Sequence, residues 1–207
     1  YRTDHLANRP EMLADAEARP SFVYAMPEPD DERCFFEETS LVGRGERRLG
    51  FGGLRERLRA RVAPRGIEDD EAAVDEEEFC YIPMGGALPD PRQRVVPFGG
   101  AAATVHPSTG YQLCRMMASS TQVAEAVVRA LGAGASADAA AADAHAALWS
   151  REARLQRDFQ VFGGEFLQQA NVETLRGFFA GFFALDTATW GGFLAGWEGL
   201  PRTHRHA

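Results

Sequence analysis

The chain has 207 residues, 45% of them hydrophobic, which is enough to bury a core as one domain or as a domain with an appendage. Its net charge of −8 argues against nucleic acid as a partner, because nucleic-acid binding needs a basic face. No apolar run reaches membrane-spanning length, and three widely spaced cysteines without a CxxC pattern indicate reduced thiols and no metal site.

The first region, residues 1–97, is predicted to hold strands and short helices. Residues 22–26 and 34–42 have the pattern of strands, and the Pro-Glu-Pro-Asp-Asp turn between them predicts a hairpin. Residues 54–62 are predicted to form a helix with Leu54, Leu58 and Val62 on one face and arginines on the other.

The second region, residues 98–132, begins with the string FGGAAATVHPSTGY after a short apolar run at 95–96. We expect a strand, a glycine turn and then a helix over 108–131, with Ser108 as its N-cap and Gly132 at its end. Such a turn leaves backbone N–H groups pointing at whatever lies in front of them, which suits a phosphate or a cofactor edge. A tight loop that needs no ligand is the simpler alternative.

The last two regions are an alanine-rich stretch and an aromatic one. Residues 133–147 are assigned as a linker, with an alanine helix as the alternative, and residues 148–207 as an aromatic-rich helical region. An apolar stripe at helical spacing in that region either packs in the core or lies on a bilayer surface. Its members are Leu175, Phe178, Phe179, Phe182, Phe183, Trp190, Phe193 and Trp197.

Glu37 and Glu38 are the candidate catalytic groups. They are adjacent in a predicted strand, so only one of them can face a given pocket. Apolar neighbours would raise the pKa of a buried carboxyl group, and a protonated acid in an apolar pocket can add a proton to a carbon–carbon double bond. On the residues alone, two ordinary acids on a solvent-facing edge strand is the simpler interpretation.

Several strings together resemble the plant and algal lycopene cyclases over roughly residues 20–200. They are FFEET at 35–39, YIPMGGALP at 81–89, HPSTGY at 106–111, RLQRDF at 154–159 and WGGFL at 190–194. The resemblance implies an α/β protein, α+β within this chain. This chain would be the C-terminal part of a Rossmann-like FAD-binding flavoprotein, with a substrate-domain sheet and a helical C-terminal region.

The resemblance also implies roles for single residues. Glu37 would be the acid, with Glu38 orienting or assisting it. The residues that would contact FAD are Gly99, Gly100, His106, Pro107, Thr109, Gly110 and Tyr111. Gly100-Ala101 stands where many flavoproteins have Gly-Asp, which favours cyclases over hydroxylases, and a structural use of His106 is favoured over a proton shuttle.

The implied activity is proton-initiated closure of the linear ends of lycopene to β or ε rings, with reduced FAD and with NADPH as reductant. The strings at 35–38 and 81–83 lean towards the ε type, those at 84–86 and 107–109 towards the β type, and the sum leans slightly to ε. The resemblance implies a plastid location peripheral to a membrane. An FAD-dependent monooxygenase and a non-catalytic carotenoid-binding fragment remain as alternatives.

The chain opens Tyr1-Arg2-Thr3-Asp4, without Met or a signal sequence, and is therefore expected to be a fragment. The part implied to be missing includes the N-terminal nucleotide-binding strand and its GxGxxG turn.

Overall fold

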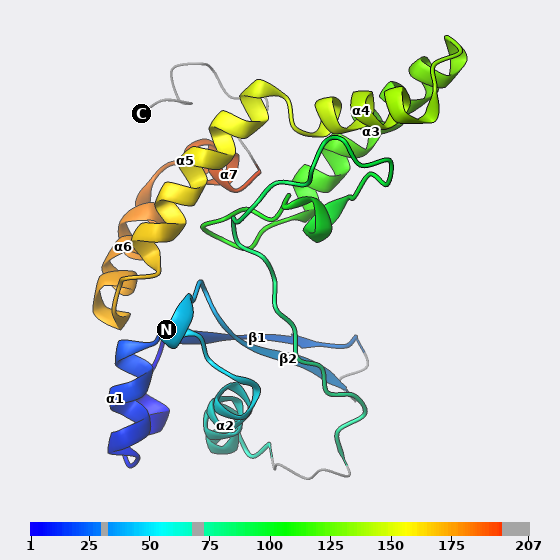
Figure 1. Cartoon of the computed structure of the whole chain (residues 1–207). Coiled ribbons are helices and arrows are strands. Elements are labelled where there is room, and N and C mark those ends of the chain that lie inside the picture. Colours follow the sequence, from blue (N-terminus) through cyan, green and yellow to red (C-terminus); the bar gives the residue numbers. More distant parts are fainter. Residues whose placement is uncertain (30–32, 68–72, 196–207) are drawn as a thin grey trace. The chain divides into compact units, whose positions relative to one another are not determined.

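The computed structural model describes residues 1–29, 33–67 and 73–195. It forms two compact units, one of residues 1–81 and 167–181 and the other of residues 82–166 with the chain from 182 onward. The described residues contain several helices and one two-stranded sheet (Figure 1), so the α+β expectation for this chain is confirmed. No strand forms at 95–96 in this described part, and the wider Rossmann-like fold stays a prediction.

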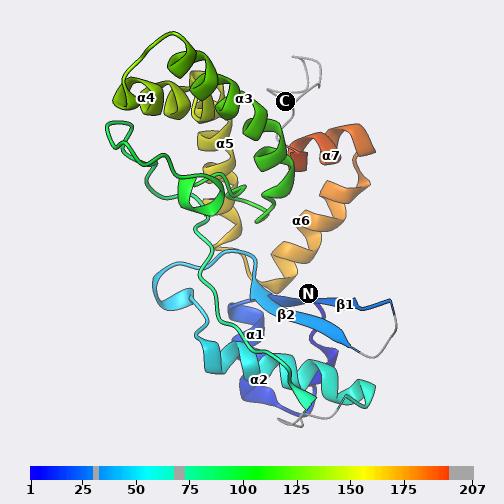
Figure 2. The same cartoon turned by 90° about the vertical axis from the view of Figure 1, so that its right-hand side faces the viewer.

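The first unit is built around the predicted hairpin, which is confirmed. Strand β1 (Ser21–Pro27) pairs antiparallel with β2 (Cys34–Ser40), in a register that joins Ser21 to Ser40 and Pro27 to Cys34. Helices α1 (Pro10–Ala18) and α2 (Phe51–Val62) lie on the same side of this hairpin in both views (Figures 1 and 2). Three short 3-10 turns, Asp4–Leu6, Gly45–Arg47 and Ala63–Arg65, connect these elements.

Helix α2 was expected over residues 54–62, and it forms, but its faces differ from the prediction. Val62 is buried as expected, whereas Leu54 and Leu58 are only half-buried. Arg57 and Arg61, which were expected to face water, are instead among the buried side chains. They are buried because each finds acceptors on neighbouring elements, which a pattern of apolar and charged residues does not reveal.

The second unit is helical. It contains the 3-10 turn Gly99–Ala102, α3 (Leu113–Gly132), α4 (Ala137–Leu148), α5 (Arg151–Leu167) and α7 (Thr187–Ala195). Helix α6 (Val172–Ala184) contributes its last residues here and the rest to the first unit. Figures 1 and 2 both show α3 and α4 side by side.

The alanine-rich stretch is a helix and not a linker. Alanine has the highest helix propensity, and the Ser136 hydroxyl caps α4 by accepting from the N–H of Ala139 at 3.2 Å. At the end of α4, Trp149 belongs to a core cluster with Ala102 and Ala103. Its indole N–H donates to the Ala102 carbonyl at 2.9 Å and so fixes the glycine turn to this end of α4.

The helix expected from Ser108 begins instead at Leu113. The Ser108 hydroxyl is buried and donates to the Gln160 carbonyl of α5 at 2.6 Å, so it does not cap a helix. Residues 106–111 therefore form a turn that is attached to α5 before α3 begins.

The aromatic stripe divides between the core and the surface. Leu175 lies in a buried cluster with Leu167 and Ala170, whereas Phe183 is 55% exposed. Trp197 lies outside the described residues. Among the described helices none is long and apolar enough by itself to cross a membrane; one pair, Val172–Phe183 with Thr187–Ala195, meets that test jointly by length and composition, with a bend of 114°.

Candidate functional site

The two glutamates of β2 lie on opposite faces of the hairpin, as the strand period predicts. Glu38 is 8% exposed and faces α2, whereas Glu37 is half-buried on the other face. The structure thus separates two side chains that are adjacent in the sequence, and only one of them is in a position to meet a ligand on the open face.

Polar partners surround Glu38. Arg61 donates from Nε to Oε2 at 2.7 Å and from Nη2 to Oε1 at 2.8 Å, a two-pronged ion pair. The Ser21 hydroxyl donates to Oε1 at 2.6 Å. The expectation of a carboxyl group among apolar neighbours therefore does not describe Glu38, whose two oxygens are both engaged inside the unit.

Apolar side chains surround Glu37 on its face of the hairpin. Tyr24 is the cross-strand partner of Glu37. Met26 and Phe35, each two residues further along its strand, form the next pair on the same face. Met26 is 51% and Phe35 56% exposed, and the Phe22 ring packs against Tyr24 at a centroid distance of 5.1 Å. Large exposed apolar side chains gathered on one face are typical of a surface that binds another apolar group.

The segment just before Tyr81 lies near Glu37. The pKa of the Cys80 thiol is raised, chiefly because it donates a hydrogen bond to Glu78 at 2.9 Å, and the charge of Glu37 contributes as well. The Arg48 guanidinium lies over the Tyr81 ring, 5.6 Å from its centroid. Cys80, the residue before the string that begins at Tyr81, therefore lies close enough to Glu37 to be affected by its charge.

The glycine turn is built for a close approach. Gly99 has φ +66°, and a Cβ there would lie 2.9 Å from Nε2 of Gln112. The Thr104 hydroxyl donates back to the Gly99 carbonyl at 2.9 Å. Glycine is thus favoured at 99 by the positive φ, whereas the end of the flexible Gln112 side chain could shift to admit a Cβ.

Backbone N–H groups of the following turn are not free to face a ligand. Thr109 and Gly110 donate to the His106 carbonyl at 3.2 and 2.9 Å, and Tyr111 donates to the Thr109 hydroxyl at 3.3 Å. Ser108 donates from its backbone to His106 Nδ1 at 3.2 Å. The expectation that this turn leaves its N–H groups open to a cofactor is therefore wrong for these residues.

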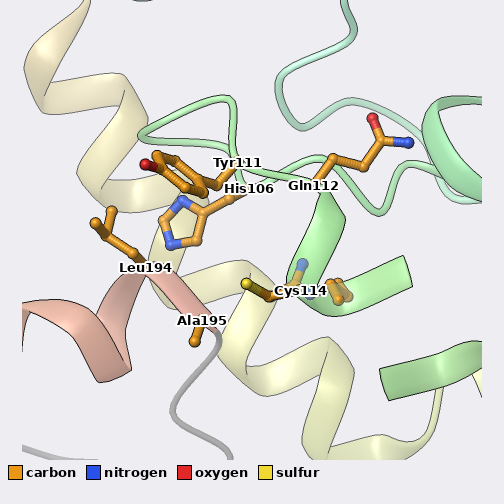
Figure 3. A pocket seen from close by; sticks show the side chains of 7 residues that line it. His106, Tyr111, Gln112, Cys114, Leu194 and Ala195 are labelled. Atoms are coloured by element: carbon orange, nitrogen blue, oxygen red, sulfur yellow. The ribbon is translucent and has the colours of Figure 1, made fainter. Parts of the chain in front are cut away.

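A shallow hollow, without enclosed room even for a water molecule, lies beside this turn (Figure 3). The His106 and Tyr111 side chains line it together, with Leu194 and Ala195 at the end of α7 facing them. Its other lining residues, Gln112, Cys114 and Arg115, come from the start of α3. Of the residues expected to contact a cofactor, the structure brings His106 and Tyr111 to this hollow.

His106 is 2% exposed and neutral at physiological pH. Its pKa is lowered from 6.5 to about 4, first because burial disfavours the charged ring and second because of the charge on Arg115. The Phe193 ring meets the imidazole edge to face, with 4.8 Å between the ring centroids. The backbone of Phe193 acts to raise the pKa of His106, but it does not form a hydrogen bond of good geometry with the ring. Nε2 is left buried without such a bond.

This burial predicts a pH dependence of stability. As pH falls through 6.5 the unfolded chain gains a proton on His106, but the folded chain does not until about pH 4, so the free energy of unfolding decreases across that window. Between pH 7 and pH 5 the expected loss from this residue is about 2 kcal/mol. Urea unfolding at both pH values should show a loss smaller by that amount in His106→Gln; an equal loss in both proteins would contradict the assignment.

Two glycines of α5 make a contact that the sequence analysis missed. A Cβ at Gly164 would lie 2.5 Å from the Pro107 carbonyl oxygen, and one at Gly163 would lie 2.8 Å from the Ser108 hydroxyl. Helix α5 therefore lies directly against the turn that lines the hollow. A glycine pair inside a helical segment was the available signal, because glycine is unfavourable there unless close packing requires it.

Arg57 and Arg61 were also missed as functional candidates. Their spacing of four residues places them on one face of α2, which is the only sign in the sequence that they act together. Across the described ranges no three His, Cys, Asp or Glu side chains gather in a group that could hold a metal ion.

The chain resembles known proteins along nearly its whole length. The family model described as lycopene cyclase protein matches residues 1–201. The chain is 42% identical over 205 residues to the chloroplastic lycopene beta cyclase of Arabidopsis thaliana and 41% over 203 residues to the chloroplastic/chromoplastic one of Capsicum annuum. It is 39% identical over 197 residues to the chloroplastic neoxanthin synthase of Solanum lycopersicum.

These alignments cover nearly all of the chain but less than half of each relative. The two cyclase alignments take in 97% of the chain and 40% of the relative, and the third takes in 94% and 39%. No solved structure matches.

Proposed function

Because the chain belongs to the lycopene cyclase family, we propose that the intact protein that carries it closes the linear ends of lycopene into rings by adding a proton to a carbon–carbon double bond. The observation that carries this proposal is the position of Glu37. Its carboxyl group is half-buried on a hairpin face with exposed apolar side chains, which suits a reaction between an acid and a hydrocarbon.

In the proposed reaction Glu37 donates the proton and this apolar face holds the end of the substrate. The proton adds to one carbon of the terminal double bond, and the resulting carbocation is attacked by a second double bond of the same molecule, which closes the ring. Loss of a proton from a neighbouring carbon then restores neutrality, so no net oxidation or reduction occurs. Tyr24, Met26 and Phe35 would contact the hydrocarbon and, once it is bound, reduce the access of water that would otherwise capture the cation.

FAD is proposed as the cofactor, with NADPH as its reductant. Reduced FAD, when bound, supplies negative charge that stabilises a carbocation. The hollow itself has no room for such a group, but two polar features beside the turn would suit its edge: Nε2 of His106 is buried without a hydrogen bond, and the first N–H groups of α3 have no partner within the helix. Of the expected contacts, Gly99 and Gly100 lie beside the Gln112 side chain at the start of α3, and the Pro107 carbonyl lies against Gly164 of α5.

The details of this site differ from what the resemblance implied. Because the N–H groups of Thr109, Gly110 and Tyr111 are bonded within the turn, the backbone N–H groups at the start of α3 would be the ones to hold the cofactor. Arg115, whose Nη2 donates to Gln160 Oε1 at 2.8 Å, adds a positive charge there.

For the ring type we propose β. The relatives named as lycopene cyclases are β cyclases, and they give no support to the slight lean towards ε. The same relatives are named chloroplastic or chromoplastic, which supports a plastid location for the intact protein. Peripheral contact with a membrane stays a proposal that rests on the apolar substrate and on exposed side chains such as Phe183.

A second candidate concerns the substrate. The relative named neoxanthin synthase is nearly as similar to the chain as the β cyclases are, which favours a carotenoid other than lycopene as an alternative. The same acid on the same apolar face would serve that substrate.

The test is expression of the intact protein in bacteria that accumulate lycopene, with pigments separated by chromatography and oxygen uptake recorded. We expect β rings without oxygen consumption, and ε rings would correct the ring type alone. Hydroxylated products with oxygen uptake would instead favour the monooxygenase. Unchanged lycopene bound to a folded protein would favour a carotenoid-binding role.

A further inference from the structure

Beneath the hairpin lies a cluster of charged and polar side chains that the proposed reaction does not use. It joins four elements of the first unit, because α1, β1, β2 and α2 each contribute a side chain to it. The members are Asp15, Ser21, Glu38, Arg57 and Arg61.

The contacts run through the cluster without a break. Arg61 holds both oxygens of Glu38, and Ser21 donates to one of them. Arg57 donates from Nη1 to the Ser21 hydroxyl at 3.0 Å and pairs through Nη2 with Asp15. Arg61 also donates from Nη1 to the Arg2 carbonyl at 3.0 Å, so it binds the N-terminal segment to the same cluster.

Net stability alone does not explain this cluster. Removing two charges from water costs about as much as their attraction returns, so well-packed apolar side chains would hold α2 on the hairpin equally well. An arginine inside the unit has another effect, because its buried charge needs a carboxylate as counter-charge. In β2, where two glutamates are adjacent, this requirement determines which of them faces the interior.

We propose that Arg61 is a positioning residue: its ion pair holds Glu38 inside the unit and so presents Glu37 on the apolar face. Glu38 is then the anchor of β2 and not a proton donor. The inference rests on the proposed function, since it assigns Glu37 as the acid, but the geometry that it explains is independent of any substrate.

Kinetics of the intact protein test the positioning role. Arg61→Gln leaves the Glu38 carboxylate unpaired in the interior, which should displace β2 and lower kcat about a hundredfold with little change in KM for lycopene. Adding Glu38→Gln removes that charge and lets two neutral amides pair, so the double variant should regain at least about tenfold in kcat. The matched control is Arg94→Gln, which breaks an equally two-pronged but exposed pair with Asp138 and should leave both constants unchanged.

Two kinetic results would overturn the proposal. One is a folded, flavin-containing Arg61→Gln protein with unchanged kcat. The other is a double variant that stays inactive although it is folded, since Glu38 would then act directly. If the Arg61→Gln protein does not fold, the activity of the double variant still tests whether Glu38 acts only as an anchor. A protein that forms no ring before any substitution speaks against the proposed function and not against the role of Arg61.

Carboxyl labelling tests the same inference without activity. With a carbodiimide and an amine, followed by mass spectrometry, Glu37 should react at least about tenfold faster than Glu38, because a buried group reacts only when the structure opens locally. In Arg61→Gln this ratio should fall towards one. Equal labelling in the unsubstituted protein, or an unchanged ratio in the variant, would overturn the assignment.

Discussion

Glu37→Gln is expected to lower the rate of ring formation about a thousandfold, because a positioned general acid contributes that order of magnitude. The amide keeps the shape and polarity of the side chain but has no acidic proton to give. Since Glu37 is only half-buried and its face of β2 is open, folding should be unaffected. The rate is measured on purified intact protein with lycopene and reduced flavin.

The control is the same substitution at Glu56, an exposed residue of α2 in the same unit, which should leave the rate unchanged. Glu37→Asp should retain part of the activity, because it keeps a carboxylic acid but draws it back by one methylene. Full activity in Glu37→Gln would remove Glu37 from the mechanism and leave the apolar face without its acid.

Gly164→Ala is expected to lower the free energy of unfolding by about 3 kcal/mol or more and to weaken flavin binding. The added Cβ would lie 2.5 Å from the Pro107 carbonyl oxygen and 3.2 Å from its carbon. Both are backbone atoms, so no side-chain rotation relieves the clash. Helix α5 must move away from the turn that carries His106, and the hollow beside it changes shape with it. Urea unfolding and flavin content per protein chain are the two measurements.

Gly177→Ala is the matched control, because Gly177 also lies inside a helix, α6, but a Cβ there meets no atom within 4 Å. Alanine should raise stability at that position by about 1 kcal/mol through its higher helix propensity. If Gly164→Ala proved as stable as Gly177→Ala, α5 would not lie against Pro107 in solution.

The hairpin and its opposed glutamates were predictable because they depend on local rules. A strand alternates its side chains, and a proline-rich acidic stretch favours a turn, so β1, β2 and the separation of Glu37 from Glu38 follow from neighbours in sequence. The role of Glu37 as an acid is different. It comes from the resemblance, and on residue patterns alone two ordinary surface acids were favoured.

What could not be predicted depends on partners distant in the sequence. Ser108 looked like an N-cap, but its hydroxyl bonds to the Gln160 carbonyl, 52 residues away, and α3 begins later at Leu113. Arg61 looked solvent-facing, yet Glu38 lies 23 residues earlier and makes it a buried ion-pair partner. Local patterns assign charged side chains to water unless tertiary packing supplies a counter-charge.

The most direct measurement is the isotope content of the rings that the intact protein makes from lycopene in deuterated water. If ring closure begins when a carboxylic acid such as Glu37 adds its exchangeable proton to the substrate, each ring must carry one deuterium atom from the solvent, detected as a mass increase of the product. Rings formed without deuterium would contradict proton initiation, and with it the role assigned here to the hairpin.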